Sequence, residues 1–198
     1  MHVRQLNVEG VVEFSPEIHR DQRGTFVSPF TQEALAAHTG RNAFCATQLS
    51  YSTSQRGTVR GIHFTRCPPG KAKFVSCLAG EALDFVVDLR KGSPTFGRCD
   101  TARLSGATMR ALYVPVGVGH GFAALHDGTL ISYMISGDYV PAHEIALSPL
   151  DPELGLPLPA GLELLLSERD RMAPTLKELD EQGLLPDYAE ARRIDASV

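Results

Sequence analysis

The chain has 198 residues and a formal net charge of -4, which suits one domain with a sizeable core and argues against a nucleic-acid-binding protein. No apolar run approaches the roughly 18–20 residues that span a bilayer, and the first residues lack the basic start and apolar core of a signal peptide. We therefore predict a cytoplasmic protein that has neither a membrane nor a nucleic acid as its partner.

The first part of the chain, about residues 1–42, is predicted to form an N-terminal arm of short elements. Thr31 is a residue type favoured at an N-cap, and Glu33 falls in the first turn of the helix that would follow. The expected elements are a strand at 10–14, a turn at 21–24, a short strand at 25–27 and a helix at 31–38. We expect this arm to add to the sheet of a neighbouring copy.

The middle of the chain, about 43–140, is predicted to be the barrel core, because short β-branched and aromatic runs recur between Gly, Pro, Asn and Asp. The expected strands are 58–64, 73–78, 82–89, 101–104, 111–114, 121–125 and 130–135. In the third of these, Asp84, Val86 and Asp88 share one face, whereas the other face is fully apolar. This pattern fits a barrel whose lumen carries polar groups and whose outer face packs against a second sheet.

The last part, about 141–198, is predicted to cross the barrel and end in short helices. Residues 141–159 are rich in Pro, Leu and acidic residues, which favours an ordered crossing segment. Thr175-Leu-Lys-Glu178 is a capping box that predicts a helix ending near Gly183. No repeat or low-complexity linker divides the chain, so we predict a single domain over 1–198.

Three side chains of the barrel region carry recognisable chemistry: Arg60, His63 and, about one strand later, Lys73. A histidine moves protons near neutral pH, while lysine and arginine hold anionic oxygen. A base beside two cations suits a reaction in which negative charge develops on a substrate oxygen. It also suits a site that merely binds a phosphate.

A second motif, Pro115-Val-Gly117-Val-Gly-His120, has the P-x-G-x-x-H spacing of the second cupin motif, in which a tight turn directs the histidine into the barrel. Metal-binding cupins also carry an H-x-H pair, but His63 is followed by Phe64 and Thr65. Zinc and iron sites need three or four ligands, so we expect no metal. For His120 we weigh two roles equally, which are substrate binding and a hydrogen bond within the barrel to Asp84.

Taken together, the motifs make the chain resemble the dTDP-4-dehydrorhamnose 3,5-epimerase family, the cupin-fold epimerases of dTDP-4-keto-6-deoxyhexoses, over almost its whole length. The resemblance rests on Asp21-x-Arg23-Gly24, Arg60-Gly-Ile-His63-Phe64, Lys73, Asp84-Phe-Val-Val-Asp88-Leu-Arg90, Gly92-Ser93-Pro94-Thr95-Phe96-Gly97, Pro115-x-Gly-x-x-His120-Gly-Phe122, Tyr133, Asp151-Pro152-x-Leu-Gly155 and Leu166-Ser167-x-x-Asp170. It implies an all-β cupin, or jelly-roll, barrel with short flanking helices at the C-terminus and an enzyme that needs no cofactor.

The resemblance also implies the catalytic roles. His63 matches the family's base and Asp170 the carboxylate that orients it, while Tyr133 matches the acid on the opposite face of the sugar. Lys73 matches the group that stabilises the enolate oxygen. Proton removal beside a C4 ketone gives an enolate, and a proton returned from the other face inverts the centre.

Substrate binding is implied at further positions. Arg60 and, from a neighbouring subunit, Arg23 match groups that hold the pyrophosphate, for which the planar arginine fork is apt. A homodimer is therefore expected. The other expected contacts to the dTDP-sugar are Phe26, Gln48, Ser50, His120 and Tyr139.

The chain departs from the common rhamnose-pathway enzymes at the substrate-facing rim. Those enzymes carry Asn where Ser50 stands, Gln where Lys71 stands and Lys where Met134 stands, and this chain looks closer to the antibiotic-pathway branch. We predict inversion at C5, with C3 inversion weaker or absent. The alternatives are a C3-only epimerase, a 3,4-ketoisomerase, whose pair of neighbouring histidines is missing after His63, and a non-catalytic nucleotide-sugar-binding cupin.

Overall fold

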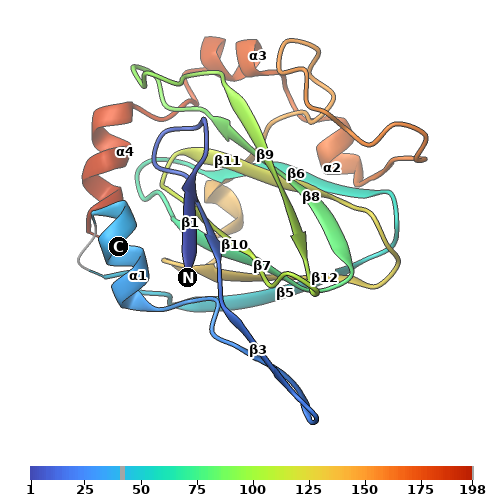
Figure 1. Ribbon diagram of the computed structural model, residues 1–198. Coiled ribbons are helices and arrows are strands. Elements are labelled where there is room, and N and C mark those ends of the chain that lie inside the picture. The colour runs from blue at the N-terminus through green and yellow to red at the C-terminus, as the bar shows by residue number, and fades with distance from the viewer. Residues whose placement is uncertain (41–42, 198) are drawn as a thin grey trace.

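The computed structural model describes residues 1–40 and 43–197, and two antiparallel sheets make up most of it (Figure 1). In spatial order the first sheet contains β1 (His2–Gln5), β2 (Val12–Ser15), β10 (Ala111–Val114), β7 (Lys73–Ala79), β12 (Thr129–Ile135) and β5 (Gln48–Ser54). The second contains β13 (Glu144–Ala146), β6 (Thr58–Thr65), β11 (Val118–Ala124), β8 (Glu81–Asp88) and β9 (Cys99–Ser105), and β14 (Leu165–Leu166) also pairs with β6.

The two sheets pack face to face around one apolar cluster. Val75 and Ile131 enter it from the first sheet, and Val86 and Phe122 enter it from the second. All seven barrel strands expected from the sequence are present, so the all-β barrel is confirmed. The sequence pattern does not predict β5, the edge strand of the first sheet.

Helices and loops cover the outer faces of the sheets. Leu35 of α1 (Gln32–Thr39) and Ile194 of α4 (Tyr188–Asp195) pack on the first sheet. The apolar face of β8 packs instead against Leu147, Leu154 and Leu179, which belong to the crossing segment and to α3 (Leu176–Glu181). The prediction that this face meets a second sheet was wrong, because the first sheet lies on the other side of β8, across the lumen, and the C-terminal segment covers this outer face.

Local capping explains where the helices begin. Thr31 Oγ1 accepts a hydrogen bond from Ala34 N at the start of α1, and the predicted capping box of Thr175 and Glu178 opens α3. The remaining short elements are η1 (Pro141–His143) and α2 (Glu168–Arg171). No helix among residues 1–40 and 43–197 is long and apolar enough to cross a membrane.

The N-terminal segment divides into two parts. β1 and β2 extend the first sheet of this chain through β10, with β1 at its edge, and the expectation that the arm adds to a neighbour's sheet stays a prediction. β3 (Ile18–Asp21) and β4 (Gly24–Val27) form a separate hairpin, which projects away from the barrel in Figure 1.

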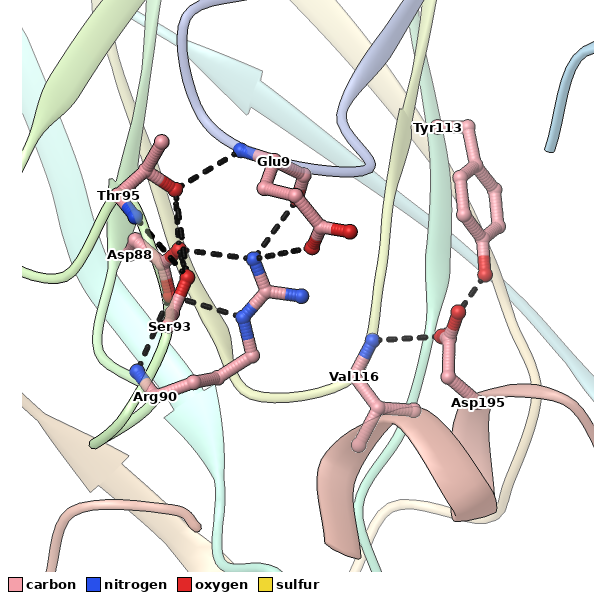
Figure 2. A network of polar contacts seen from close by, with 8 residues as sticks. All are labelled: Glu9, Asp88, Arg90, Ser93, Thr95, Tyr113, Val116 and Asp195. Atoms are coloured by element: carbon pink, nitrogen blue, oxygen red, sulfur yellow. Dashed lines mark hydrogen bonds and ion pairs between the residues drawn. The ribbon is translucent and has the colours of Figure 1, made fainter. Parts of the chain in front are cut away.

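A buried ion pair anchors the N-terminal loop, which joins β1 to β2, to the second sheet (Figure 2). Arg90 donates through Nε and Nη2 to the two carboxylate oxygens of Asp88, each at 2.8 Å, and through Nη2 to the carbonyl oxygen of Glu9 at 2.7 Å. The hydroxyls of Ser93 and Thr95 donate to Asp88 Oδ2, each at 2.6 Å. Burial raises the pKa of Asp88, but Arg90 and the two hydroxyls outweigh it and hold that pKa below the usual value.

Asp195 makes a second anchor, which ties the C-terminal helix to the first sheet (Figure 2). Its Oδ1 accepts hydrogen bonds from the Tyr113 hydroxyl at 2.9 Å and from Val116 N at 2.7 Å. Both ends of the chain are thus fixed to the barrel by polar contacts.

Asp88→Asn tests the first anchor. We expect it to lower the free energy of unfolding by about 3–5 kcal/mol at pH 7, because Arg90 stays buried without its charged partner. Since the folded pKa of Asp88 lies below its unfolded value, the carboxylate's contribution is present above about pH 4 and is lost as the pH falls through the folded pKa. Urea unfolding at pH 7 and at pH 3 measures both effects.

The matched control is Asp180→Asn, which breaks the half-exposed pair of Asp180 with Lys91. It should cost no more than about 1 kcal/mol. Equal losses in the two variants would contradict the view that the buried pair anchors the loop.

Candidate active site

The predicted catalytic residues line one cavity of about 390 Å³. His63 comes from β6 of the second sheet, and Lys73 and Tyr133 come from β7 and β12 of the first. Asp170 enters from α2 in the C-terminal segment. The cavity therefore has walls from both sheets, with the histidine and the phenol on different walls.

His63 and Asp170 form a dyad. The His63 Nε2 and Asp170 Oδ1 atoms are 2.6 Å apart, and the Asp170 side chain is only 4% exposed. Burial raises the pKa of Asp170, but His63 and the hydroxyl of Ser167 outweigh it and hold that pKa below the usual value. Because an ionised carboxylate only accepts hydrogen bonds, Nε2 carries the proton and Nδ1 is the basic nitrogen.

Lys73 lies beside this dyad, and its Nζ donates to the carbonyl oxygen of His63 at 3.2 Å. Burial lowers the pKa of the Lys73 ammonium, and the charge of Lys71 acts in the same direction. The carboxylates of Glu144 and Asp84 oppose both effects. Lys73 is thus a half-buried side chain whose positive charge is disfavoured by burial and favoured by two nearby carboxylates.

Tyr133 approaches from the other sheet, and its hydroxyl lies 3.0 Å from Ser52 Oγ. Burial raises the pKa of Tyr133 to about 12. Its ring stands edge-on to that of His120, with the centroids 6.2 Å apart. His120 Nε2 lies 2.9 Å from Asp84 Oδ2, so the expected bond within the barrel is present on a side chain that also lines the cavity.

A second pocket, of about 250 Å³, shares His63, Lys73 and Tyr133 with the first. Gln48 organises its rim, because its Nε2 donates to Ser50 Oγ at 2.8 Å and its Oε1 accepts from Tyr139 N at 2.7 Å. The predicted binding residues Gln48, Ser50 and Tyr139 are therefore brought together next to the dyad.

Several lining residues are missing from the predicted set, and Arg169 and Glu144 are two charged ones. Arg169 lines the first cavity with Arg60, and Glu144 lines the second. Arg169 Nη2 also donates to the carbonyl oxygen of Glu144 at 2.9 Å, and Glu144 pairs with Lys71 at 2.9 Å. Arg169 occupies an unspecified position of the Leu166-Ser167-x-x-Asp170 motif. The one signal in the sequence that it lies at the site was its position next to Asp170.

Arg23 and Phe26 are not brought to this cavity. They lie on the β3–β4 hairpin, where the Arg23 side chain is 85% exposed and Phe26 is 68% exposed. Arg23 Nη2 pairs with Asp21 Oδ2 at 2.6 Å. Within one chain these two residues form a surface of their own.

Among residues 1–40 and 43–197, no three His, Cys, Asp or Glu side chains gather in a way that could hold a metal ion. His63 and His120 each turn Nε2 toward a carboxylate. The expectation that the reaction needs no metal stays a prediction.

Comparisons with known proteins decide the family. The profile described as dTDP-4-dehydrorhamnose 3,5-epimerase matches residues 5–178. The chain belongs to the dTDP-4-dehydrorhamnose 3,5-epimerase family. The expected resemblance is confirmed, and with it an isomerase that acts on sugars.

Three relatives in this family show the range of its members. A dTDP-4-dehydrorhamnose 3,5-epimerase of Streptomyces griseus is 42% identical over 95% of this chain and 93% of its own. NovW, a 4-keto-6-deoxy sugar epimerase from the novobiocin biosynthetic cluster of Streptomyces spheroides, is 46% identical with a TM-score of 0.93 over 96% of this chain and 95% of that one. ChmJ of Streptomyces bikiniensis, a 3'-monoepimerase, is 39% identical with a TM-score of 0.93 over 100% and 98% of the two chains.

The ChmJ structure is that of a variant in complex with dTDP, with one histidine changed to asparagine and one tyrosine to phenylalanine. These neighbours confirm the cupin-like jelly roll and the likeness to epimerases of antibiotic pathways. They leave the role of each site residue in this epimerase untested.

Gly61→Ala tests the close approach of the two strands that carry the histidines. His63 and His120 are opposite each other on β6 and β11. Gly61 has φ 109°, and a Cβ there would lie 2.6 Å from both Gly121 Cα and the His120 carbonyl oxygen. We expect the variant to lose about 2–4 kcal/mol of unfolding free energy in urea titrations and to bind dTDP more weakly, since β6 and β11 must separate.

Gly128→Ala is its control, because Gly128 also has a positive φ, 72°, but a Cβ there would meet nothing within 4 Å. It should cost about 1–2 kcal/mol for the backbone conformation alone and leave dTDP binding unchanged. A smaller loss for Gly61→Ala than for Gly128→Ala would contradict the packing argument.

Proposed function

We propose that this epimerase inverts centres beside the C4 ketone of a dTDP-4-keto-6-deoxyhexose by removing a proton and returning one through an enolate, without a cofactor. One observation carries the proposal. The His63–Asp170 dyad and the Tyr133 hydroxyl line a single cavity from different sheets, with the Lys73 ammonium in the same cavity. A base and an acid on different walls can act on opposite faces of one sugar ring.

His63 serves as the base. Asp170 accepts the Nε2 proton at 2.6 Å, which keeps Nδ1 basic and stabilises the imidazolium that forms when Nδ1 takes a proton. A carboxylate whose pKa is held low stays ionised throughout this cycle.

Lys73 stabilises the enolate oxygen. When the C–H bond beside the ketone breaks, its electron pair moves to the C4 oxygen, which becomes anionic. A buried ammonium stabilises such an oxyanion far more strongly than one in water. Burial lowers the pKa of Lys73 and so works against its charged form, whereas the nearby carboxylates of Glu144 and Asp84 favour the charge that this task requires.

Tyr133 serves as the acid. With its pKa raised to about 12, the phenol is protonated at neutral pH and can give its proton to the carbanion carbon. The changed histidine and tyrosine of the ChmJ variant are as many residues apart as His63 and Tyr133. The spacing supports the pair without assigning the roles.

The remaining lining residues suit contacts with the nucleotide part of the substrate. Arg60 and Arg169 supply guanidinium groups to the first cavity and suit the diphosphate. Gln48, Ser50 and Tyr139 line the second pocket and suit polar and stacking contacts with the rest of the substrate. His120 faces the first cavity as a further substrate contact.

Both carbons next to the ketone are acidified, so one base can serve C3 and C5. We propose inversion at both, in line with the family description and the Streptomyces griseus relative, whose names print 3,5. The second candidate is a C3-only epimerase, which the ChmJ name favours. The preference for C5 over C3 drawn from the sequence stays a prediction.

The reaction is tested by incubating the enzyme with dTDP-4-keto-6-deoxyglucose in D₂O and following C3 and C5 by NMR. We expect deuterium at both carbons, and His63→Ala should slow its uptake about 10²–10⁴-fold because the base is lost. His126→Ala is the control, since His126 is an exposed histidine paired with Glu81 and should keep the full rate.

Each other result excludes a specific function. Uptake at C3 alone selects the C3-only epimerase, and a carbonyl that migrates from C4 to C3 selects a ketoisomerase. No uptake by the native enzyme, or near-normal uptake by His63→Ala, would reject the mechanism.

We also propose that the enzyme is a homodimer in which the β3–β4 hairpin of one subunit completes the site of the other. Phe26 and Arg23 are exposed on a hairpin that leaves the barrel (Figure 1), and an exposed aromatic ring beside a cation suits a nucleotide in a neighbouring site. The cytoplasmic location stays a prediction.

Mixed dimers test this arrangement. Arg23→Ala and His63→Ala are each expected to be poorly active alone. A refolded equal mixture should recover about a quarter of native activity, because half of the dimers are mixed and each holds one complete site. The control mixture, Arg60→Ala with His63→Ala, should recover none, since both residues belong to the same subunit's cavity. No recovery in the first mixture, or activity in a monomer, would contradict the shared site.

A further inference from the structure

β5 is the edge strand of the first sheet and lines the site with short polar side chains. It pairs with β12, in register Tyr133 with Ser50. Leu49, Tyr51 and Thr53 are exposed, whereas the alternate positions are more buried. The inner face of β5 therefore presents a row made of Gln48, Ser50, Ser52 and Ser54.

Two serines of this row each contact a different residue of the site. Ser52 Oγ lies 3.0 Å from the Tyr133 hydroxyl. Ser54 Oγ accepts a hydrogen bond from Arg60 Nε at 3.1 Å. The two serines are one step apart on the same strand face, but one holds the expected acid and the other holds an expected phosphate ligand.

We propose that Ser52 is a positioning residue for Tyr133, which holds the phenol toward the substrate and donates a hydrogen bond to the phenolate left after Tyr133 has given up its proton. This inference rests on the proposed function, in which Tyr133 is the acid. No role for Ser52 follows from the residue motifs, because a serine in a polar edge strand is ordinary.

The proton balance of the step is closed. The Tyr133 O–H bond breaks, its proton bonds to the carbanion carbon through the enolate electron pair, and the C4 ketone reforms. The phenolate then accepts a hydrogen bond from the Ser52 hydroxyl, which keeps its own proton. Water later returns a proton to Tyr133 and takes the one that His63 removed.

Burial of Tyr133 disfavours its phenolate, and a hydrogen bond from Ser52 counteracts this effect. This burial raises the pKa of Tyr133 to about 12, so the phenolate is disfavoured, while the hydrogen bond with Ser52 acts in the opposite direction. A hydroxyl can accept from the phenol and donate to the phenolate without moving its oxygen. Serine thus suits both states of the acid.

The experiment compares two rates on the same substrate in D₂O. Deuterium uptake reports proton removal by His63, and inversion reports the proton returned by Tyr133. With a weakened acid, the enolate is more often reprotonated from the face on which it formed. The number of inversions per deuterium taken up therefore reports Tyr133 separately from His63.

We expect Ser52→Ala to lower inversions per exchange about tenfold, the effect of one hydrogen bond to a charged group, with KM little changed. Ser52→Thr should restore the native ratio, since it keeps the hydroxyl. Ser54→Ala is the matched variant, because it removes the hydroxyl that contacts Arg60. It should raise KM about tenfold and leave inversions per exchange unchanged.

The possible failures are distinguishable. If Tyr133→Phe lowers inversions per exchange but Ser52→Ala does not, Ser52 has no positioning role while the proposed function stands. If Tyr133→Phe leaves the ratio unchanged, the acid is elsewhere and both proposals fail. If Ser52→Ala and Ser52→Thr lose uptake and inversion equally while their thermal unfolding matches the native protein, the serine does not act through Tyr133.

Discussion

The hydrogen bond between His63 and Asp170 joins two parts of the chain that are 107 residues apart. His63 belongs to a central strand pair of the second sheet, whereas Asp170 arrives on a short helix of the C-terminal segment. The carboxylate reaches the imidazole only because Leu147, Leu154 and Leu179 pack that segment on the outer face of the sheet. Apolar burial outside the barrel thereby sets the geometry of a polar contact inside it.

Burial has opposite consequences for the charged groups of the lumen. It lowers the pKa of Lys73 and raises those of Asp84 and Tyr133. Burial also raises the pKa of Asp170, but the hydrogen bonds from His63 and Ser167 outweigh it and hold that pKa below the usual value. Burial thus keeps the phenol protonated while direct hydrogen bonds keep the carboxylate ionised within the same site, as general acid–base catalysis requires.

Much of the barrel follows from the sequence, because its central strands are half apolar and are divided by turn residues. β8 is an example, with Phe85 and Val87 on the face that packs under the C-terminal segment. The sequence pattern does not predict β5, and the reason is physical. Its inner face contacts polar groups of the site and its outer face is exposed, so neither face needs apolar residues. The prediction of what covers the outer face of β8 was wrong, because an apolar strand face does not specify which element packs on it.

The site could be predicted where a motif fixes the spacing of residues on one strand, as it does for Arg60 and His63. Tyr133 and Asp170 came from the family resemblance, and the structure brings them to the same cavity. Arg169 and Glu144 were missed because charged residues on short elements are common. Arg23 and Phe26 lie outside the cavity of their own chain, and no pattern within one strand reveals which copy they serve.

The projecting β3–β4 hairpin has a thermodynamic consequence under the proposed dimer. If each nucleotide is held partly by the neighbouring subunit, binding the nucleotide and joining the subunits become linked equilibria. Saturating nucleotide would then strengthen the association of the subunits, and strong dilution of the protein would lower its affinity for the nucleotide. The amount of this protein in the cell would thereby help to set how tightly it holds its substrate.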